Sequence, residues 1–473
     1  MMPEKEVLKN LTERYADQIR HRPTACVVTF GCQMNARDSE KLRGVLQGAG
    51  FELTEDEKAD FVIYNTCTVR ENANTRVFGR LGRLKNYKKK NPAMILGICG
   101  CMMQEKGAAE DVRTRLPFVD LVFGTFNLDR FPHLLALVLS EKLQDCSSAA
   151  LAEPVIEVID DEKRNPEELP SVRTFPFKAG VNIMYGCNNF CSYCIVPYVR
   201  GRERSRGEED ILKEIQGLCA DGVKEIMLLG QNVNSYGRDL GHETGFPELL
   251  DRIARETDLA RIRFMTSHPK DLSDRLISVM AEHDSICSHL HLPVQSGSNR
   301  ILKRMNRQYT REKYLDLVGR IRAAIPDISL TTDIIVGFPG ETADDVQDTI
   351  DLVREVGFDN AFTFLYSKRT GTPAASMPDQ VDPDTASVHF NRLLEAVHET
   401  ALERCGRFAG RTVKALVEDV NRHQEGWVTG RLEHNLLIHF PGKRELIGEC
   451  VDVDVKESRG FYLIGDRRET FGD

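Results

Sequence analysis

The sequence predicts a mixed α/β protein with an amino-terminal doubly wound parallel sheet, a central partial (β/α)6 barrel and a carboxy-terminal small β-barrel. Strand-like apolar and β-branched runs alternate with helical stretches from residue 24, and the alternation resumes beyond a largely polar stretch. From residue 412 the chain has only short strand-like runs separated by turn residues. Its 473 residues suit three domains of about 150 residues each. We expect a lead-in at 1–22, domains at 23–139, 173–405 and 406–473, and a linker at 140–172.

The composition predicts a protein of a reducing, aqueous compartment. No apolar run reaches the roughly 18 residues of a membrane span, and the first residues lack the apolar core of a secretory signal. Thirteen cysteines in such a chain favour metal binding or catalysis over a disulfide framework. We therefore expect a cytoplasmic protein without a membrane partner, and we expect it to act as a monomer.

In the amino-terminal domain, three cysteines each follow a predicted strand. The strands are expected at 24–30, 60–65 and 93–99, and Cys32, Cys67 and Cys101 come just after them. Because the carboxyl ends of parallel strands gather on one rim of a sheet, these cysteines should converge and could hold a metal cluster. Ordinary buried cysteines would fit the same pattern equally well.

The central domain begins with a stronger signal. Cys187, Cys191 and Cys194 have a C-x3-C-x2-C spacing and follow a predicted strand at 180–185. Three thiolates in this spacing suit a 4Fe-4S cluster with one iron left open to another ligand. A zinc knuckle would need a fourth Cys or His nearby, and 195–206 offers neither.

Six predicted strands give the central domain its partial barrel, with a site expected at their carboxyl ends. The strands are expected at 180–185, 224–229, 261–266, 287–292, 328–336 and 360–366. Candidate ligand contacts after them include Gln231, Asn232, Gln295, Ser296 and Glu341. Taken singly, each of these residues fits an ordinary turn as well as a contact.

Basic residues favour an RNA partner although the net charge is −9. Candidate phosphate contacts follow the central cysteines and lie on a predicted basic helix: Arg200, Arg202, Arg204, Arg206, Arg76, Arg80 and Arg83. A solvated charged surface is the alternative. The small carboxy-terminal barrel is a frequent nucleic-acid binding architecture, in which Trp427 would stack on a base or, as we favour, fill the core.

Several motifs resemble those of the radical S-adenosylmethionine (SAM) methylthiotransferases that modify transfer RNA. The likeness is carried by 185–206 around the central cysteines, and by Phe30-Gly31-Cys32-Gln33-Met34-Asn35, 65–71 and Gly100-Cys101-Met102 around the others. It covers about residues 23–470 and implies a radical SAM core and a carboxy-terminal TRAM domain. Segments 229–234 and 291–298 look most like the subgroup acting on isopentenylated adenosine.

The resemblance implies two 4Fe-4S clusters and SAM as cofactors. Cys187, Cys191 and Cys194 would bind the radical cluster, and Cys32, Cys67 and Cys101 the auxiliary one. Tyr193 would lie near the adenine of SAM, with further SAM contacts from the strand ends named above. The expected reaction puts a methylthio group on carbon 2 of N6-isopentenyladenosine at position 37 of transfer RNA, with SAM as radical source and methyl donor and an electron donor as partner.

Three alternatives stay open on sequence alone. A methylthiotransferase of the same family would act on a ribosomal-protein aspartate or on threonylcarbamoyl-adenosine in transfer RNA. An RNA-bound iron-sulfur electron carrier without catalytic activity would share the cysteine motifs. The first two differ in the modified product, and the last predicts no cleavage of SAM.

Overall fold

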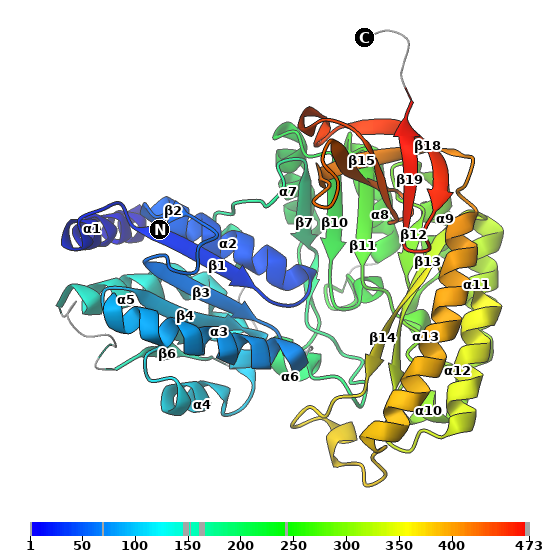
Figure 1. Cartoon of the computed structure of the whole chain (residues 1–473), viewed down its shortest axis with the longest axis horizontal. Helices are drawn as coiled ribbons and strands as arrows, with labels where there is room; N and C mark the ends of the chain where they lie inside the picture. Colours follow the sequence, from blue (N-terminus) through cyan, green and yellow to red (C-terminus); the bar gives the residue numbers. More distant parts are fainter. Residues whose placement is uncertain are drawn as a thin grey trace. The chain divides into compact units, whose positions relative to one another are not determined.

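The computed structural model describes residues 2–68, 71–144, 151, 153–159, 166–241 and 245–468, and the side chains of 2–4 and 71–76 are not described. The chain forms two compact units (Figure 1). Unit 1 comprises 1–174, 185–188 and 195–203, and unit 2 comprises 175–184, 189–194 and 204–473. Among the described residues, no helix is both long enough and apolar enough to cross a bilayer.

Unit 1 contains a six-stranded parallel sheet in the order β2-β1-β3-β4-β5-β6. Its strands are β1 (Thr24–Thr29), β2 (Glu52–Leu53), β3 (Phe61–Thr66), β4 (Ile95–Gly100), β5 (Leu121–Phe123) and β6 (Val155–Glu157). Its helices are α1 (Met2–Ile19), α2 (Gln33–Ala49), α3 (Glu71–Lys90), α4 (Ala108–Arg115), α5 (Phe131–Gln144) and α6 (Val196–Arg200), with short 3-10 helices η1 (Cys101–Gln104), η2 (Thr125–Arg130) and η3 (Pro166–Glu168).

Helices cover both faces of this sheet. Because side chains alternate along a strand, Ile63 of β3 joins the core beneath α1, α2 and α5, whereas Val62 and Tyr64 join the core beneath α3 and α4. All six strands run parallel, so their carboxyl ends form one rim. The predicted doubly wound sheet is confirmed.

Two segments of unit 1 differ from the sequence-based expectation. The expected lead-in is the helix α1, and it differs from a separate lead-in only in that it packs into the unit: its buried Tyr15 donates its hydroxyl to the carbonyl of Ala93 (2.8 Å). In the expected linker, Val155–Glu157 forms β6 and pairs with β5. Residues 145–150, 152 and 160–165 of that linker lie outside the described residues. The lead-in and part of the linker therefore contribute to the folded unit.

Unit 2 contains two three-stranded parallel sheets, β11-β10-β7 and β12-β13-β14, that share one hydrophobic core. Their strands are β7 (Lys178–Asn182), β10 (Glu225–Leu229), β11 (Arg261–Met265), β12 (His289–His291), β13 (Ser329–Val336) and β14 (Asn360–Leu365). An isolated bridge between Ile262 and Ile286 links the two sheets beside β11 and β12. The predicted six-stranded partial barrel is confirmed.

Helices cover the outer face of these strands, and α13 packs between β14 and α12 (Figure 1). They are α7 (Glu208–Ala220), α8 (Phe246–Glu256), α9 (Asp274–Glu282), α10 (Asn299–Arg304), α11 (Arg311–Ala324), α12 (Ala343–Val356) and α13 (Pro383–Gly406). The short elements are β8 (Met184–Tyr185), β9 (Arg204–Ser205), η4 (Val233–Ser235), η5 (Pro269–Asp271), η6 (Pro373–Ser376) and η7 (Arg444–Leu446).

A closed five-stranded barrel completes unit 2 in the order β15-β16-β17-β19-β18. Its strands are β15 (Thr412–Val420), β16 (Trp427–Leu432), β17 (Leu437–Pro441), β18 (Cys450–Ser458) and β19 (Tyr462–Arg467). Trp427 is half-buried and lies outside the barrel core, so the expectation that it fills the core is wrong. It lines a surface cleft with 420–426 and 442–445.

The small barrel docks against the amino ends of β7, β10 and β11. Arg261, the first residue of β11, donates to the carbonyls of Arg431 (2.6 Å) and Lys414 (2.9 Å). Arg263 donates to the carbonyls of residues 433 (2.8 Å) and 432 (2.7 Å) and to the carboxylate of Glu225 (3.0 Å). Burial alone would raise the pKa of Glu225, but Arg263, Lys178 and Arg261 together lower it. The site expected at the carboxyl ends therefore lies on the opposite rim.

Candidate iron-sulfur and SAM site

The three amino-terminal cysteines converge at the carboxyl rim of the sheet in unit 1. Cys32 is the N-cap of α2, Cys67 directly follows β3, and Cys101 begins η1 after β4. The Oδ1 of Asn35 lies 3.8 Å from the Sγ of Cys32 and 3.7 Å from the Sγ of Cys101. A Cβ on Gly31 would lie 2.9 Å from the Sγ of Cys67. The predicted convergence is confirmed.

Backbone conformation and amide groups fix this arrangement. Gly31 has φ +118°, a conformation that favours glycine, and a Cβ there would also lie 2.5 Å from the Cβ of Cys67. The Nδ2 of Asn35 donates to the carbonyls of Phe30 (2.9 Å) and Thr66 (2.8 Å), which joins the ends of β1 and β3. The Nδ2 of Asn65 donates to the carbonyl of Asn35 (2.9 Å). The loops that carry the cysteines are therefore tied to one another.

The chemistry of this triad fits an iron-sulfur cluster. Three thiols near one another, with no fourth cysteine among the described residues of this rim, can ligate three irons of a cubane and leave the fourth open. Burial raises the pKa of Cys101 to about 12, although the Arg200 guanidinium lowers it. Metal binding would offset that burial, because a coordinated thiol is deprotonated. Cys99 lies instead in the hydrophobic core shared with α5.

The central cysteines are divided between the two units, with Cys187 in unit 1 and Cys191 and Cys194 in unit 2. The backbone N–H of Cys187 donates to the carbonyl of Gly201 (3.1 Å) in unit 1. In unit 2, the N–H of Cys194 donates to the carbonyl of Cys191 (2.9 Å), and the buried Arg307 donates to the Sγ of Cys191 (3.4 Å). Backbone hydrogen bonds thus fix each part of the loop within its own unit, and the Sγ of Cys191 accepts a hydrogen bond from a buried cation.

Tyr193 lies in unit 2 and packs against a small apolar cluster. That cluster contains Ile301, Met305, Phe338 and Ala374. Tyr193 is half-buried and lies between two cysteines of the loop in the sequence, Cys191 and Cys194. This position is compatible with the predicted contact to the adenine of SAM.

The expected SAM contacts lie at the carboxyl ends of β10, β12 and β13, as predicted. Asn232 and Gln295 are buried, and Gln231 is half-buried. The Oδ1 of Asn232 and the Oε1 of Gln295 have no hydrogen-bond partner among the described residues. Buried polar groups of this kind are costly unless a ligand or water satisfies them, so these two atoms fit a polar ligand.

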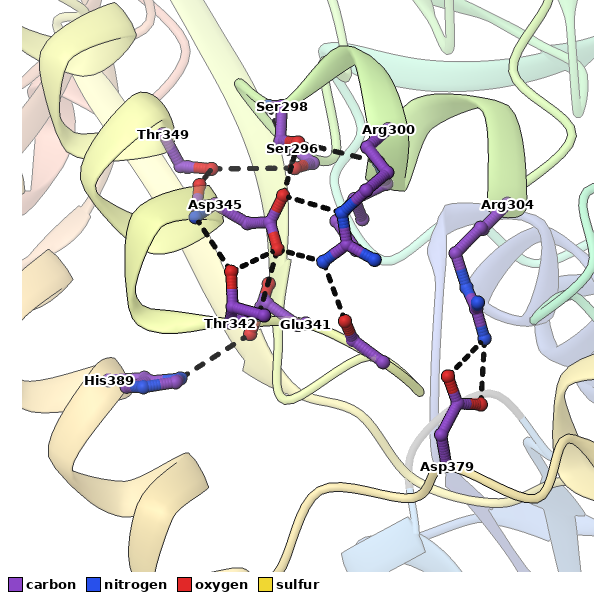
Figure 2. Close-up of polar contacts among 12 residues, drawn as sticks. Ser296, Ser298, Arg300, Arg304, Glu341, Thr342, Asp345, Thr349, Asp379 and His389 are labelled. Atoms are coloured by element: carbon purple, nitrogen blue, oxygen red, sulfur yellow. Dashed lines mark hydrogen bonds and ion pairs between the residues drawn. The ribbon is translucent and has the colours of Figure 1, made fainter.

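Ser296 and Glu341 lie in a polar network beneath the ends of β12 and β13. Figure 2 shows Ser296 beside Thr349, with 3.4 Å between the hydroxyl oxygens. The N–H of Gly337 donates to Glu341 (2.5 Å), and the Nδ1 of His389 lies 3.7 Å from the same carboxylate (Figure 2). Burial raises the pKa of Glu341 to about 8. Glu341 is therefore a carboxyl group that a bound cation would help to ionise.

Two of the predicted RNA-contacting arginines are buried. Arg206 is 5% exposed and donates to the carbonyl of Asn182 (2.5 Å) and to Glu214 (2.7 Å). Arg200 is 6% exposed and donates to the Sγ of Cys101 (3.2 Å). The expectation of phosphate contact is wrong for these two, because their guanidinium groups are enclosed and bonded within the protein.

The other predicted RNA contacts differ in exposure. Arg83 and Arg202 are exposed, and Arg204 is half-buried. Arg80 pairs with Glu57 (3.2 Å). The side chain of Arg76 lies outside the described residues. Of these arginines, Arg83 and Arg202 are therefore the solvent-exposed ones.

Sequence reasoning missed an aromatic pair on β14. Phe362 and Phe364 are 46% and 43% exposed, and the register places them on the face of Asp333 in β13, opposite to the face that packs against the helices. His291 of β12 lies on this face too, with its Nε2 3.4 Å from Asp333 and its ring 5.9 Å from that of Phe362. The i, i+2 spacing of the two phenylalanines was the available signal.

Comparisons with known proteins agree with this site. Family models match at 181–353 (Radical SAM superfamily), 24–124 (Uncharacterized protein family UPF0004) and 406–466 (TRAM domain). A tRNA-2-methylthio-N(6)-dimethylallyladenosine synthase of Lachnoclostridium phytofermentans is 53% identical over 97% of this chain and 98% of that protein. Proteins of the same name from Clostridium perfringens and Thermoanaerobacter sp. are 51% and 49% identical over 93% of this chain, and over 97% and 92% of their own lengths. The chain belongs to the tRNA-2-methylthio-N(6)-dimethylallyladenosine synthase family of radical SAM enzymes.

Proposed function

We propose that this protein transfers a methylthio group to carbon 2 of N6-dimethylallyladenosine at position 37 of transfer RNA. The observation that carries the proposal is the pair of cysteine triads, one on the carboxyl rim of unit 1 and one in the C-x3-C-x2-C loop. A carrier of electrons needs one cluster with complete ligation, whereas two triads each leave an iron open for chemistry. The names of the relatives support the same substrate.

The residues divide the reaction between two places. Cys187, Cys191 and Cys194 would hold the radical cluster, and the triad of unit 1 would hold an auxiliary cluster. When bound with SAM, the first cluster supplies a radical able to remove the hydrogen from carbon 2 of adenine, a bond without usable acidity. Asn232 and Gln295 offer unpaired buried oxygens to SAM. Glu341 offers a carboxyl group whose ionised form the amino group of SAM would stabilise.

The inward aromatic pair of unit 2 supports an apolar base as substrate. The exposed rings of Phe362 and Phe364 can pack against an adenine that carries a dimethylallyl group, since base–aromatic stacking is worth about 1–3 kcal/mol. His291 and Asp333 beside them supply polar groups for the base edge. These four side chains would orient the base.

Transfer RNA would contact exposed basic and aromatic groups. The exposed Arg83 and Arg202 would contact phosphate, and Trp427 in the cleft of the small barrel would stack on a base. An external electron donor would reduce the clusters, and we expect the protein to act as a cytoplasmic monomer.

Mass spectrometry of reaction products tests the proposal. Anaerobically reconstituted protein receives SAM, a reductant and either transfer RNA bearing N6-isopentenyladenosine or transfer RNA bearing N6-threonylcarbamoyl-adenosine. We expect a methylthio product from the isopentenylated RNA, no 5′-deoxyadenosine from Cys187→Ala, and SAM cleavage without methylthio product from Cys32→Ala. Cys99→Ala is the matched control and should form product. A wild type that cleaves SAM and leaves the isopentenylated RNA unchanged would refute the substrate.

A further inference from the structure

A buried arginine contacts the cysteine triad of unit 1. Arg200 ends α6, shortly after the C-x3-C-x2-C loop in the sequence. Its Nε donates to the Sγ of Cys101 (3.2 Å), and its Nη2 donates to the Oδ1 of Asn35 (2.8 Å) and the carboxylate of Asp38 (3.0 Å). All four residues belong to unit 1 and lie at the rim that carries the triad.

The packing around α6 holds this guanidinium in place. Ile195 and Val199 pack with Cys101 in one buried apolar cluster. The hydroxyl of Thr125 donates to the carbonyl of Val199 (2.8 Å), one residue before the arginine. Arg200 therefore approaches the sulfur from a segment that is fixed by both apolar and polar contacts.

The charge balance explains why a buried guanidinium is tolerated here. The carboxylate of Asp38 lies 3.0 Å from the Nη2 of Arg200, so the buried guanidinium has an anionic partner. Asp38 balances the charge, so the Nε–H remains available to a sulfur acceptor. A charge-assisted hydrogen bond is about twice as strong as a neutral one, and here it is directed at a thiolate ligand.

We propose that Arg200 is a positioning residue for the auxiliary cluster. Through its N–H···S bond, Arg200 would hold the Cys101 ligand in place and raise the reduction potential of the cluster. The inference rests on the proposed second cluster. Hydrogen bonds to cluster sulfurs and a nearby positive charge both stabilise the reduced form, which carries more negative charge. Asn35 serves the same ligand, since its Oδ1 accepts from Arg200 between the sulfurs of Cys32 and Cys101.

Redox titration of the isolated auxiliary cluster tests this role. The full-length chain carrying Cys187→Ala, Cys191→Ala and Cys194→Ala is the parent, because only the triad of unit 1 then remains. After anaerobic reconstitution, iron and sulfide content are measured, and the reduction midpoint is followed by electron paramagnetic resonance. Arg200→Gln in this parent is compared with Arg202→Gln, which removes the same charge from an exposed side chain.

We expect Arg200→Gln to lower the midpoint potential by at least about 59 mV. For a one-electron couple this shift corresponds to a tenfold change in the ratio of oxidised to reduced cluster at a fixed potential. Arg202→Gln should leave the midpoint at the parent value. Equal midpoints in the two variants would overturn the inference. Loss of iron from Arg200→Gln alone, with its far-ultraviolet circular dichroism unchanged, would support the ligand-holding role.

A further variant covers the case in which Arg200→Gln fails to fold. Arg200→Lys keeps the buried positive charge beside Asp38 and removes the Nε–H that is directed at the Sγ of Cys101, so its midpoint should fall below the parent value by less than the loss expected for Arg200→Gln. A midpoint equal to the parent value would overturn the inference. A parent that binds no iron after reconstitution would instead refute the second cluster, and with it the proposed function of the triad. The two failures are therefore distinguishable.

Discussion

Replacing Gly31 by alanine should destroy the auxiliary site while leaving the radical site intact. The added Cβ would lie 2.5 Å from the Cβ of Cys67 and 2.9 Å from its Sγ, and the residue would have to keep φ +118°. Both effects act directly on a cysteine of the triad. Neither involves the loop of Cys187, Cys191 and Cys194.

The expected magnitude follows from these two effects. An alanine held at such a φ costs about 1–3 kcal/mol. Overpacking against a fixed neighbour costs about 1–3 kcal/mol more. The unfolding free energy of unit 1 should therefore fall by about 2–6 kcal/mol, a large share of the 5–15 kcal/mol typical of a folded domain. Any relaxation that lowers this cost must displace Cys67 from the triad.

Iron analysis and SAM cleavage separate the two sites. We expect Gly31→Ala to retain about half of the wild-type iron after reconstitution and to form 5′-deoxyadenosine without methylthio product. Gly48→Ala is the matched control, because a Cβ there meets nothing within 4 Å and helical alanine is favoured by up to about 1 kcal/mol. Full iron content and normal product formation in Gly31→Ala would refute the reasoning.

Three further changes have defined outcomes. Burial raises the pKa of Glu341 from 4.5 to about 8, so between these pH values the folded chain keeps a proton that the unfolded chain releases. The unfolding free energy should therefore fall by a few kcal/mol as the pH rises from about 5 to about 8. Urea titrations at several pH values should show a weaker dependence of the unfolding free energy on pH for Glu341→Gln than for the wild type. Arg263→Met leaves the buried Glu225 without its closest cation and should lower the unfolding free energy by about 3–5 kcal/mol in chemical denaturation. Arg411→Gln removes an exposed ion pair and should lower it by about 1 kcal/mol or less. Equal losses of unfolding free energy in the two variants would contradict the docking role of Arg263. Phe362→Ala should raise KM for isopentenylated RNA severalfold in steady-state assays with little change in SAM cleavage, and an unchanged KM would exclude base packing on that ring.

Most of the fold could be predicted from the sequence because buried parallel strands have a recognisable pattern. Buried strands such as β3 and β4 are continuous apolar runs, and the rule that their carboxyl ends share a rim was enough to bring Cys32, Cys67 and Cys101 together. The three-residue β5 and β6 are too short to show a period, so they were absent from the expected sheet.

The same reasoning could not resolve the arginines after the cysteine loop. Their charges suggest solvent and phosphate, and nothing in their spacing shows that Arg200 ends a helix against Cys101 or that Arg206 pairs with Glu214. Burial of a charge depends on tertiary partners far away in sequence, such as Asp38. The aromatic pair of β14 escaped notice for a related reason, since exposed rings on an inward face look like core residues in a sequence.

The small barrel is attached to the catalytic half partly through its main chain and partly through side-chain ion pairs, such as Lys178 with Glu418 (2.5 Å) and Lys224 with Glu449 (2.9 Å). Arg261 and Arg263 donate to main-chain carbonyl oxygens of residues 414, 431, 432 and 433, which persist whatever side chains stand at those positions. The main-chain part of the attachment therefore persists when barrel side chains change, whereas the ion-paired part requires Glu418 and Glu449. With this mode of attachment, the barrel could be exchanged for one with a different RNA preference while the chemistry on the opposite rim is left unchanged.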